Sequence, residues 1–197
     1  EKDYFFSQTL NLPSNIVLAG KTSATTSFTF SLSGKGHAIQ FVGKRSGETA
    51  LITEPLKIGD KIINVASNFK EGDVVFIRYP EKSLLKSDWA FNHFGQIVNV
   101  LNNKNGVLSL EEPIRIDISK IELADLIKID PVKNSGIQNI HIIRKDKTYK
   151  KTSTISFKYA TDCFVNAVES EMSNYAHIEV SHSSHIEISG SYFHHAH

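Results

Sequence analysis

The sequence predicts an all-β protein: a parallel β-helix with about 23 residues per coil, interrupted by a small antiparallel β-barrel-like insertion. Three observations lead to this prediction. They are a repeat of apolar residues at a fixed interval, alternating strands near the N-terminus, and a central segment in which the repeat is lost. A single coil of such a solenoid cannot bury its inward side chains alone, so equivalent residues of neighbouring coils stack into apolar ladders.

The repeat lies in the last third of the chain, where apolar residues in an i, i+2 arrangement recur every 23 residues. Short β-branched strands separated by polar turns at this period are typical of a parallel solenoid. Two in-phase ladders are expected, and they consist of Ile140, Cys163 and Ile186 with Ile142, Val165 and Ile188, and of Ile155 and Ile178 with Phe157 and Val180.

The chain is predicted to have three parts. Residues 1–46 form the first coils with an N-terminal leader, residues 47–128 form the inserted β domain, and residues 129–197 form the regular coils. In the first part Phe28 and Phe30 alternate with Ser and Thr, the pattern of a half-buried strand. The insertion holds several short strand-like runs with tight turns, which favour a small antiparallel barrel.

Composition excludes some classes of function. The 197 residues include 40% hydrophobic and 22% charged residues, which is ordinary for a globular protein, and the net charge of +1 argues against a nucleic-acid binder. No apolar run approaches the roughly 20 residues of a membrane-spanning helix. The single cysteine, Cys163, allows no internal disulfide, and its ladder position predicts a buried thiol rather than a nucleophile.

Both ends of the chain favour a piece of a longer protein. It begins with Glu1, and residues 191–197 follow the last expected strand without any capping element. Terminal coils of solenoids need polar caps, because open ends expose apolar ladders and strand edges. We therefore expect the N-terminal fragment of a longer β-helix.

Four segments resemble a known family: SNIVLAGKTSATTSFTFS, SGIQNIHIIRK, ATDCFVNAVES and HIEISGSYFHHAH. They resemble the pectate-lyase-like superfamily of right-handed parallel β-helices, most of all its secreted bacterial members with a β-rich insertion. Members of that superfamily include polysaccharide lyases, glycoside hydrolases, phage tailspikes and passive surface proteins. The resemblance implies a secreted or cell-surface location and an extracellular polysaccharide partner. Lyases of the family hold Ca²⁺ with clustered Asp and Glu, so the resemblance alone implies Ca²⁺ as a cofactor. The repeats of this chain contain no tight Asp cluster, and no other cofactor is evident.

Histidines gather at the C-terminal end of the chain. Six of the nine lie in the last 21 residues. His194 and His195, with Glu169, are the candidates for acid–base catalysis, because imidazole titrates near neutral pH. His194, His195 and His197 are the candidates for a metal site, although H-H-x-H fits no strong zinc signature. A plain surface or turn role is the ordinary alternative for all three histidines.

Three aromatic residues are candidates for substrate binding: Tyr192, Trp89 and Tyr175. The faces of pyranose rings pack on aromatic rings, whereas the alternative role is packing between coils. Tyr192 and Phe193 are adjacent in a strand, so one of them points inward and the other outward.

These observations favour a carbohydrate-active β-helix, a polysaccharide lyase or glycoside hydrolase, whose catalytic residues lie largely outside this chain. Two alternatives stay open at this point. One is a non-catalytic adhesive surface module, and the other is an exported cargo protein bound to a bacterial secretion machinery. The histidine tail distinguishes none of the three.

Overall fold

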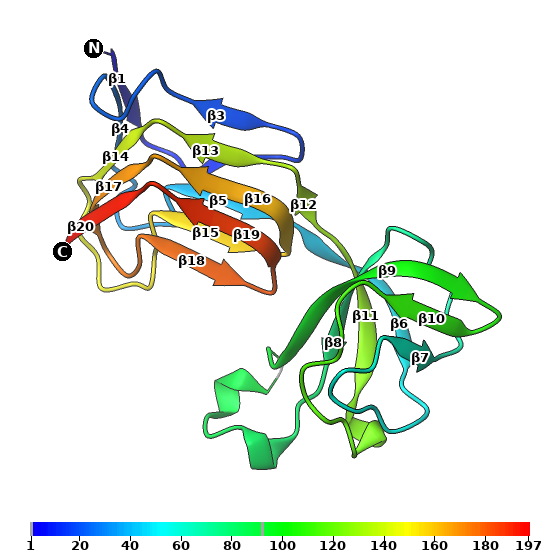
Figure 1. The fold of residues 1–197 in the computed structure, drawn as a ribbon. Helices are drawn as coiled ribbons and strands as arrows, with labels where there is room; N and C mark the ends of the chain where they lie inside the picture. Colours follow the sequence, from blue (N-terminus) through cyan, green and yellow to red (C-terminus); the bar gives the residue numbers. More distant parts are fainter. Residues whose placement is uncertain (1, 92) are drawn as a thin grey trace. The chain divides into compact units, whose positions relative to one another are not determined.

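The computed structural model describes residues 2–91 and 93–197, and almost all of its regular structure is β-strand. The chain divides into two compact units, Glu1–Gly43 with Pro131–His197, and Lys44–Asp130 (Figure 1). The sequence prediction put the corresponding boundaries at residues 47 and 128. Each unit has its own hydrophobic core. None of the helices described is long and apolar enough to cross a bilayer.

The first unit, here called the solenoid, consists of three parallel sheets whose strands alternate along the chain (Figure 1). The β20 sheet has the order β1(Lys2–Phe6), β4(Thr26–Phe30), β14(His141–Arg144), β17(Glu169–Ser173) and β20(Tyr192–Ala196). The β16 sheet joins β3(Val17–Ala19), β13(Gly136–Gln138), β16(Ala160–Asn166), β12(Val132–Lys133) and β19(Ser184–Ser189). The β15 sheet has the order β18(Ile178–Ser181), β15(Ile155–Lys158), β5(Ile39–Val42) and β2(Leu10–Asn11).

The registers correct one of the predicted ladders. The last coils are 23 residues apart, because Cys163 pairs with Ile186 (186−163) and Ile155 with Ile178 (178−155). One coil earlier the step is 28, because Ile137 pairs with Val165 (165−137). The expected stacking of Ile140 on Cys163 and of Ile142 on Val165 is therefore wrong. The five additional residues lie in the connector between β14 and β15, which has no counterpart of equal length between β17 and β18.

Aromatic and β-branched side chains fill the solenoid because equivalent inward positions stack between coils. Phe41 stacks on Phe157 with ring centroids 4.5 Å apart, and Phe6 stacks on Phe30 at 4.8 Å. The predicted leader thus contains a strand of its own, since β1 pairs in parallel with β4. Cys163 is 1% exposed in this core, as expected for a structural thiol.

The bends between sheets depend on residues in the left-handed region. Asn15, Asn134, Asp162 and His185 occupy equivalent positions of successive coils, and all four have φ between 51° and 63°. Asn and Asp tolerate this region because their short side chains bond locally. Two neighbouring pairs in this column also bond each other: Asn134 to Asn15 at 3.3 Å, and His185 Nδ1 with Asp162 Oδ1 at 3.1 Å.

The second unit is an antiparallel sheet that lies, in sequence, between β5 and β12. Its strand order is β6(Lys44–Leu51), β11(Asp125–Asp130), β8(Val74–Arg78), β9(Gly95–Lys104), β10(Val107–Leu110) and β7(Ile62–Asn64). Three short 3₁₀ helices accompany it: η1(Lys82–Leu84), η2(Asp88–Ala90) and η3(Ile121–Leu123). The central strand β8 is buried along Val74, Val75, Phe76 and Ile77.

Candidate functional site

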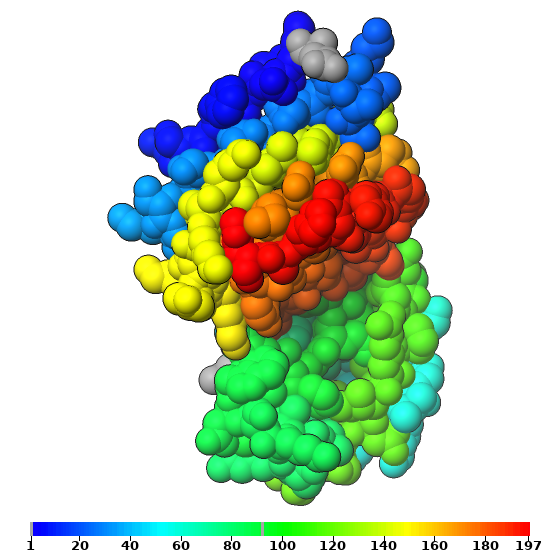
Figure 2. All heavy atoms as spheres, turned by 90° about the vertical axis from the view of Figure 1, so that its left-hand side faces the viewer, coloured from blue at the N-terminus to red at the C-terminus, as the bar shows by residue number. Residues whose placement is uncertain are grey.

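The outward face of the β20 sheet carries Glu169, Tyr192, His194 and His195, four of the residues that the sequence singled out. Registers define two rows on this face, which cross β14, β17 and β20. The first row holds His141, Glu169 and Tyr192, and the second holds Ile143, Glu171 and His194. Their neighbours Ile142, Ser170 and Phe193 point inward. Figure 2 looks onto the side of the molecule where β20, in red, lies.

Five residues of this face form what we call the His/Glu cluster: His141, Glu169, Glu171, His194 and His195. His194 Nε2 lies 3.0 Å from Glu169 Oε1, and His141 Nε2 lies 3.4 Å from Glu171 Oε2. His141 Nε2 is also 3.8 Å from Glu169 Oε1, and His195 Nδ1 is 3.8 Å from Glu171 Oε1. The two carboxylates are therefore surrounded by three imidazoles contributed by two strands, β14 and β20.

The two adjacent histidines of β20 face each other. His195 has φ of 55°, so the strand turns locally and brings its Nδ1 to 2.8 Å from Nδ1 of His194. A carboxylate accepts, so His194 Nε2–H donates to Glu169 and leaves Nδ1 of a neutral His194 to accept from His195. The chain of bonds from His195 through His194 to Glu169 can hold and relay a proton, which is what general acid–base chemistry requires.

His141 is the member of the cluster whose polar atom is least satisfied. Its Nε2 is buried and has no hydrogen-bond partner among the described residues, although both carboxylates lie near. Burying an unpaired polar atom costs free energy of about 1–3 kcal/mol. This nitrogen, one nitrogen of His194 and one oxygen of Glu171 all lie within 4.8 Å of one another.

The donor set bears on the Ca²⁺ that the family resemblance implied. In the described part of the chain, the one group of three or more His, Cys, Asp and Glu side chains close enough to share an ion is His141, Glu171 and His194. Ca²⁺ takes six to eight oxygen ligands. Two imidazoles and one carboxylate do not fit that ion.

The structure brings together some of the predicted site residues and separates others. Glu169, Tyr192, His194 and His195 share one face, and Tyr192 is 64% exposed with its ring 4.7 Å from that of His194. Trp89 belongs to η2 in the other unit and is 77% exposed.

The remaining two candidates lie outside the cluster. Tyr175 follows β17, where the ammonium of Lys151 lies 5.7 Å from its ring centroid. His197 continues the sheet, because its backbone N–H donates to Ser173, and its Nε2–H donates to the backbone oxygen of Arg144 at 3.0 Å.

Sequence reasoning missed His141 and Glu171. A 23-residue step would have aligned His141 with Phe164, whereas the true register pairs it with Glu169. Glu171 has the same strand parity as Glu169, so period-2 alternation could have found it once Glu169 was chosen. No periodic signal marked His141, because the residues that shift its register lie in the connector after Arg144.

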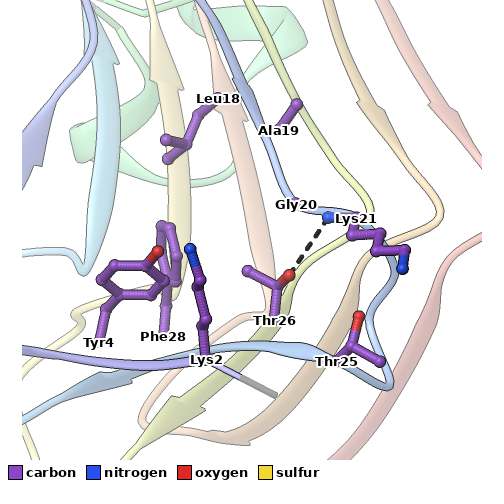
Figure 3. A pocket seen from close by; sticks show the side chains of 9 residues that line it. All are labelled: Lys2, Tyr4, Leu18, Ala19, Gly20, Lys21, Thr25, Thr26 and Phe28. Atoms are coloured by element: carbon purple, nitrogen blue, oxygen red, sulfur yellow. Dashed lines mark hydrogen bonds between the residues drawn. The ribbon is translucent and has the colours of Figure 1, made fainter.

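A hollow of about 610 Å³ lies at the N-terminal end of the solenoid, next to β1 and β3, the terminal strands of their sheets (Figure 3). Tyr4, Leu18 and Phe28 provide its apolar surface, and Lys2 and Lys21 add two ammonium groups. A hydrogen bond from the Lys21 backbone to Thr26 Oγ1 holds one wall at 3.2 Å. Its lining contains no acid–base pair and none of the predicted site residues.

Burial shifts the pKa values of two groups in the solenoid, His177 and Cys163. The pKa of His177 is lowered by burial and by nearby His194; its Nδ1 bonds Ser170 Oγ and its ring stacks on Phe193. Burial also raises the pKa of the Cys163 thiol, which excludes it as a ready nucleophile.

No family model matches the sequence, and no curated protein matches it. Solved structures do. The tailspike protein gp49 from Pseudomonas phage LKA1 is similar over 95% of this chain and 31% of its own, with a TM-score of 0.75 and 16% identity. The gp54 tailspike of Acinetobacter baumannii bacteriophage AP22, solved with A. baumannii capsular saccharide, matches 95% of this chain and 30% of its own, with a TM-score of 0.62 and 12% identity.

A third tailspike, gp61 of Pseudomonas phage phi297, matches 94% of this chain and 38% of its own, with a TM-score of 0.59 and 14% identity. The fold is that of phage tailspikes, an all-β protein with a parallel β-helix. The chain spans about a third of the length of these tailspikes. At identities this low the similarity shows the fold alone, so the activity has to be argued from the residues of the site.

Proposed function

We propose that this chain is part of an extracellular surface protein that binds and depolymerises bacterial polysaccharide, in the manner of a phage tailspike. The observation that supports this most is the exposed Tyr192 ring beside the His/Glu cluster, in a chain whose fold is similar to that of a tailspike over 95% of its length. One of those tailspikes was solved with a capsular saccharide. We also propose that the protein is a member of the pectate-lyase-like superfamily and that its regular coils have about 23 residues.

The face has the chemistry that sugar recognition uses. Tyr192 offers an apolar ring for a pyranose face, and its stacking on His194 limits the freedom that binding would otherwise remove. Glu169 and Glu171 are half-buried, so they present oriented acceptors for hydroxyl groups. Aromatic packing with convergent polar groups is the usual composition of a ligand site.

For the whole protein we propose a polysaccharide lyase or a glycoside hydrolase whose catalytic residues lie largely outside this chain. In the described part of this chain, the hydrogen-bonded row of His195, His194 and Glu169 is able to move a proton. A hydrolase would need two carboxylates flanking the glycosidic bond, and a lyase would need a base beside a neutralised uronate. An adhesive module that binds without cleavage is the second outcome of the test. Among the described residues nothing favours a secretion cargo.

The test is a panel of purified capsular polysaccharides, with binding measured by biolayer interferometry and cleavage by new reducing ends and by absorbance of unsaturated uronates. We expect saturable binding to at least one capsular polysaccharide. Absence of binding across the panel contradicts the proposal. Binding with no product from the longer protein favours the adhesive module, and unsaturated uronates distinguish a lyase from a hydrolase.

A further inference from the structure

We propose that His141, Glu171 and His194 form a binding site for a divalent transition-metal ion, with Zn²⁺ as the best match. The three residues come from three neighbouring strands, β14, β17 and β20, so one ion would join three successive coils on the outer face of the β20 sheet. This inference goes beyond the polysaccharide proposal and does not depend on it.

The distances already resemble those of a tetrahedral ion. Zinc bonds to nitrogen and oxygen of about 2.0–2.2 Å place two ligand atoms of a tetrahedral ion about 3.4 Å apart. His141 Nε2 and Glu171 Oε2 are 3.4 Å apart, and all three ligand atoms lie within 4.8 Å.

The orphaned nitrogen is the observation that points to a ligand. His141 Nε2 is buried, and it has no hydrogen-bond partner within the described residues although Glu171 is close by. A metal ion would satisfy this nitrogen and the facing carboxylate oxygen together. The two carboxylates among three imidazoles make the His/Glu cluster attractive to a cation when the imidazoles are neutral.

The residues around the three ligands are placed to support them. Both nitrogens of His194 have partners, Glu169 at Nε2 and His195 at Nδ1, so metal binding replaces one bond and the other then orients the ring. Carboxylates that bond the second nitrogen of a ligating histidine fix its tautomer and raise its basicity. Two histidines and one glutamate leave a fourth position open for water or a ligand hydroxyl.

The donor set selects among metals. Imidazole nitrogen suits Zn²⁺, Ni²⁺ and Cu²⁺, whereas carboxylate and carbonyl oxygens suit Mg²⁺ and Ca²⁺. We therefore expect Zn²⁺ to bind this face and Ca²⁺ to bind it far more weakly.

The experiment uses the chain without a polyhistidine tag, stripped with a chelator and titrated with ZnCl₂ by calorimetry, with metal content measured after dialysis. We expect one Zn²⁺ per chain and a higher melting temperature in its presence. Glu171→Gln, which keeps the shape of the side chain, and His141→Ala should each weaken Zn²⁺ binding by at least about 10- to 100-fold.

The matched control is His185→Ala, because His185 also bonds a carboxylate, Asp162, but belongs to no three-ligand group in the described chain. It should leave Zn²⁺ affinity unchanged. Equal affinity in wild type and Glu171→Gln overturns the proposal, as does tighter binding of CaCl₂ than of ZnCl₂. If His141→Ala does not fold, Glu171→Gln decides alone, with circular dichroism confirming its fold.

Discussion

The solenoid and the unit Lys44–Asp130 bury their strands in two different ways. In the solenoid each strand pairs in parallel with the equivalent strand of the next coil, so like positions stack and polar residues form columns as well. In Lys44–Asp130 the strands pair antiparallel around one sheet, and register shifts interrupt β6·β11 and β9·β10. Stacking therefore repeats a polar group along one face of the solenoid, whereas the ion pairs of Lys44–Asp130 join different strands without a repeat, as when Lys128 lies 3.0 Å from Asp73 and 3.5 Å from Glu48.

Two arginines show the difference most clearly. Arg144 of the solenoid is 0% exposed and holds Asp146 through Nε at 3.0 Å and Nη2 at 3.1 Å. Its remaining donors reach the backbone oxygens of Ser153 and Gly36. Arg78 of the other unit donates to Asp125 in the same bidentate way, through Nε and Nη2, but 26% of its side chain is exposed.

Removal of these two arginines should have the largest and most unequal effects. Arg144→Ala leaves Asp146 buried without its partner, and we expect a loss of about 3–5 kcal/mol in the free energy of unfolding. Arg78→Ala breaks a partly solvated pair, and we expect about 1 kcal/mol. Urea unfolding of both variants measures the difference.

The opening of each unit can be measured separately in the two arginine variants. Cys163 lies in the solenoid core, so its rate of reaction with a thiol reagent reports opening of that unit. Hydrogen exchange of peptides from Lys44–Asp130 reports the other. Arg144→Ala should accelerate thiol labelling strongly and Arg78→Ala should not; equal labelling rates would contradict the assignment of separate cores.

The two units should also respond to acid in different pH ranges, with smaller effects. Burial lowers the pKa of His37 and of His177 below the ordinary 6.5, so protonation favours the unfolded solenoid. Their stabilising effect is complete above pH 6.5 and is lost as the pH falls through the lowered pKa. The His37→Gln/His177→Gln variant should therefore lose less solenoid stability than wild type between pH 7 and pH 5, measured by urea unfolding.

In Lys44–Asp130 the corresponding group is Glu81. The Lys120 ammonium, 2.6 Å from Glu81 Oε2, and a hydrogen bond from the Ser83 backbone hold its pKa at about 2, below the ordinary 4.5. Its contribution is complete above pH 4.5 and falls away as the pH approaches 2. NMR titration of the Glu81 carboxyl checks this directly, and a midpoint near 4.5 would refute the pairing with Lys120.

Sequence patterns predicted more of the fold than of the site. The ladders Ile155–Ile178 and Cys163–Ile186 were visible because inward positions of a solenoid are apolar at a fixed period. The longer connector before β15 was hidden, since surface loops accept insertions at little cost and leave no periodic signal. That shift alone concealed His141 as the neighbour of Glu169. Arg144 was equally invisible, because charged residues are ordinarily exposed and the pattern does not show the partners, Asp146, Ser153 and Gly36, that bury this one.

The central claim is that polysaccharide binds the outer face of the β20 sheet rather than the exposed aromatic residue of Lys44–Asp130. The direct measurement is the dissociation constant for a bound capsular polysaccharide in Tyr192→Ala, Trp89→Ala and the control Tyr149→Ala, whose side chain is fully exposed in the connector after β14. Loss of one stacking ring, worth about 1 kcal/mol, should weaken binding about 3- to 10-fold in Tyr192→Ala. Trp89→Ala and Tyr149→Ala should bind as wild type does. Unchanged affinity in Tyr192→Ala, or a loss confined to Trp89→Ala, would contradict the account.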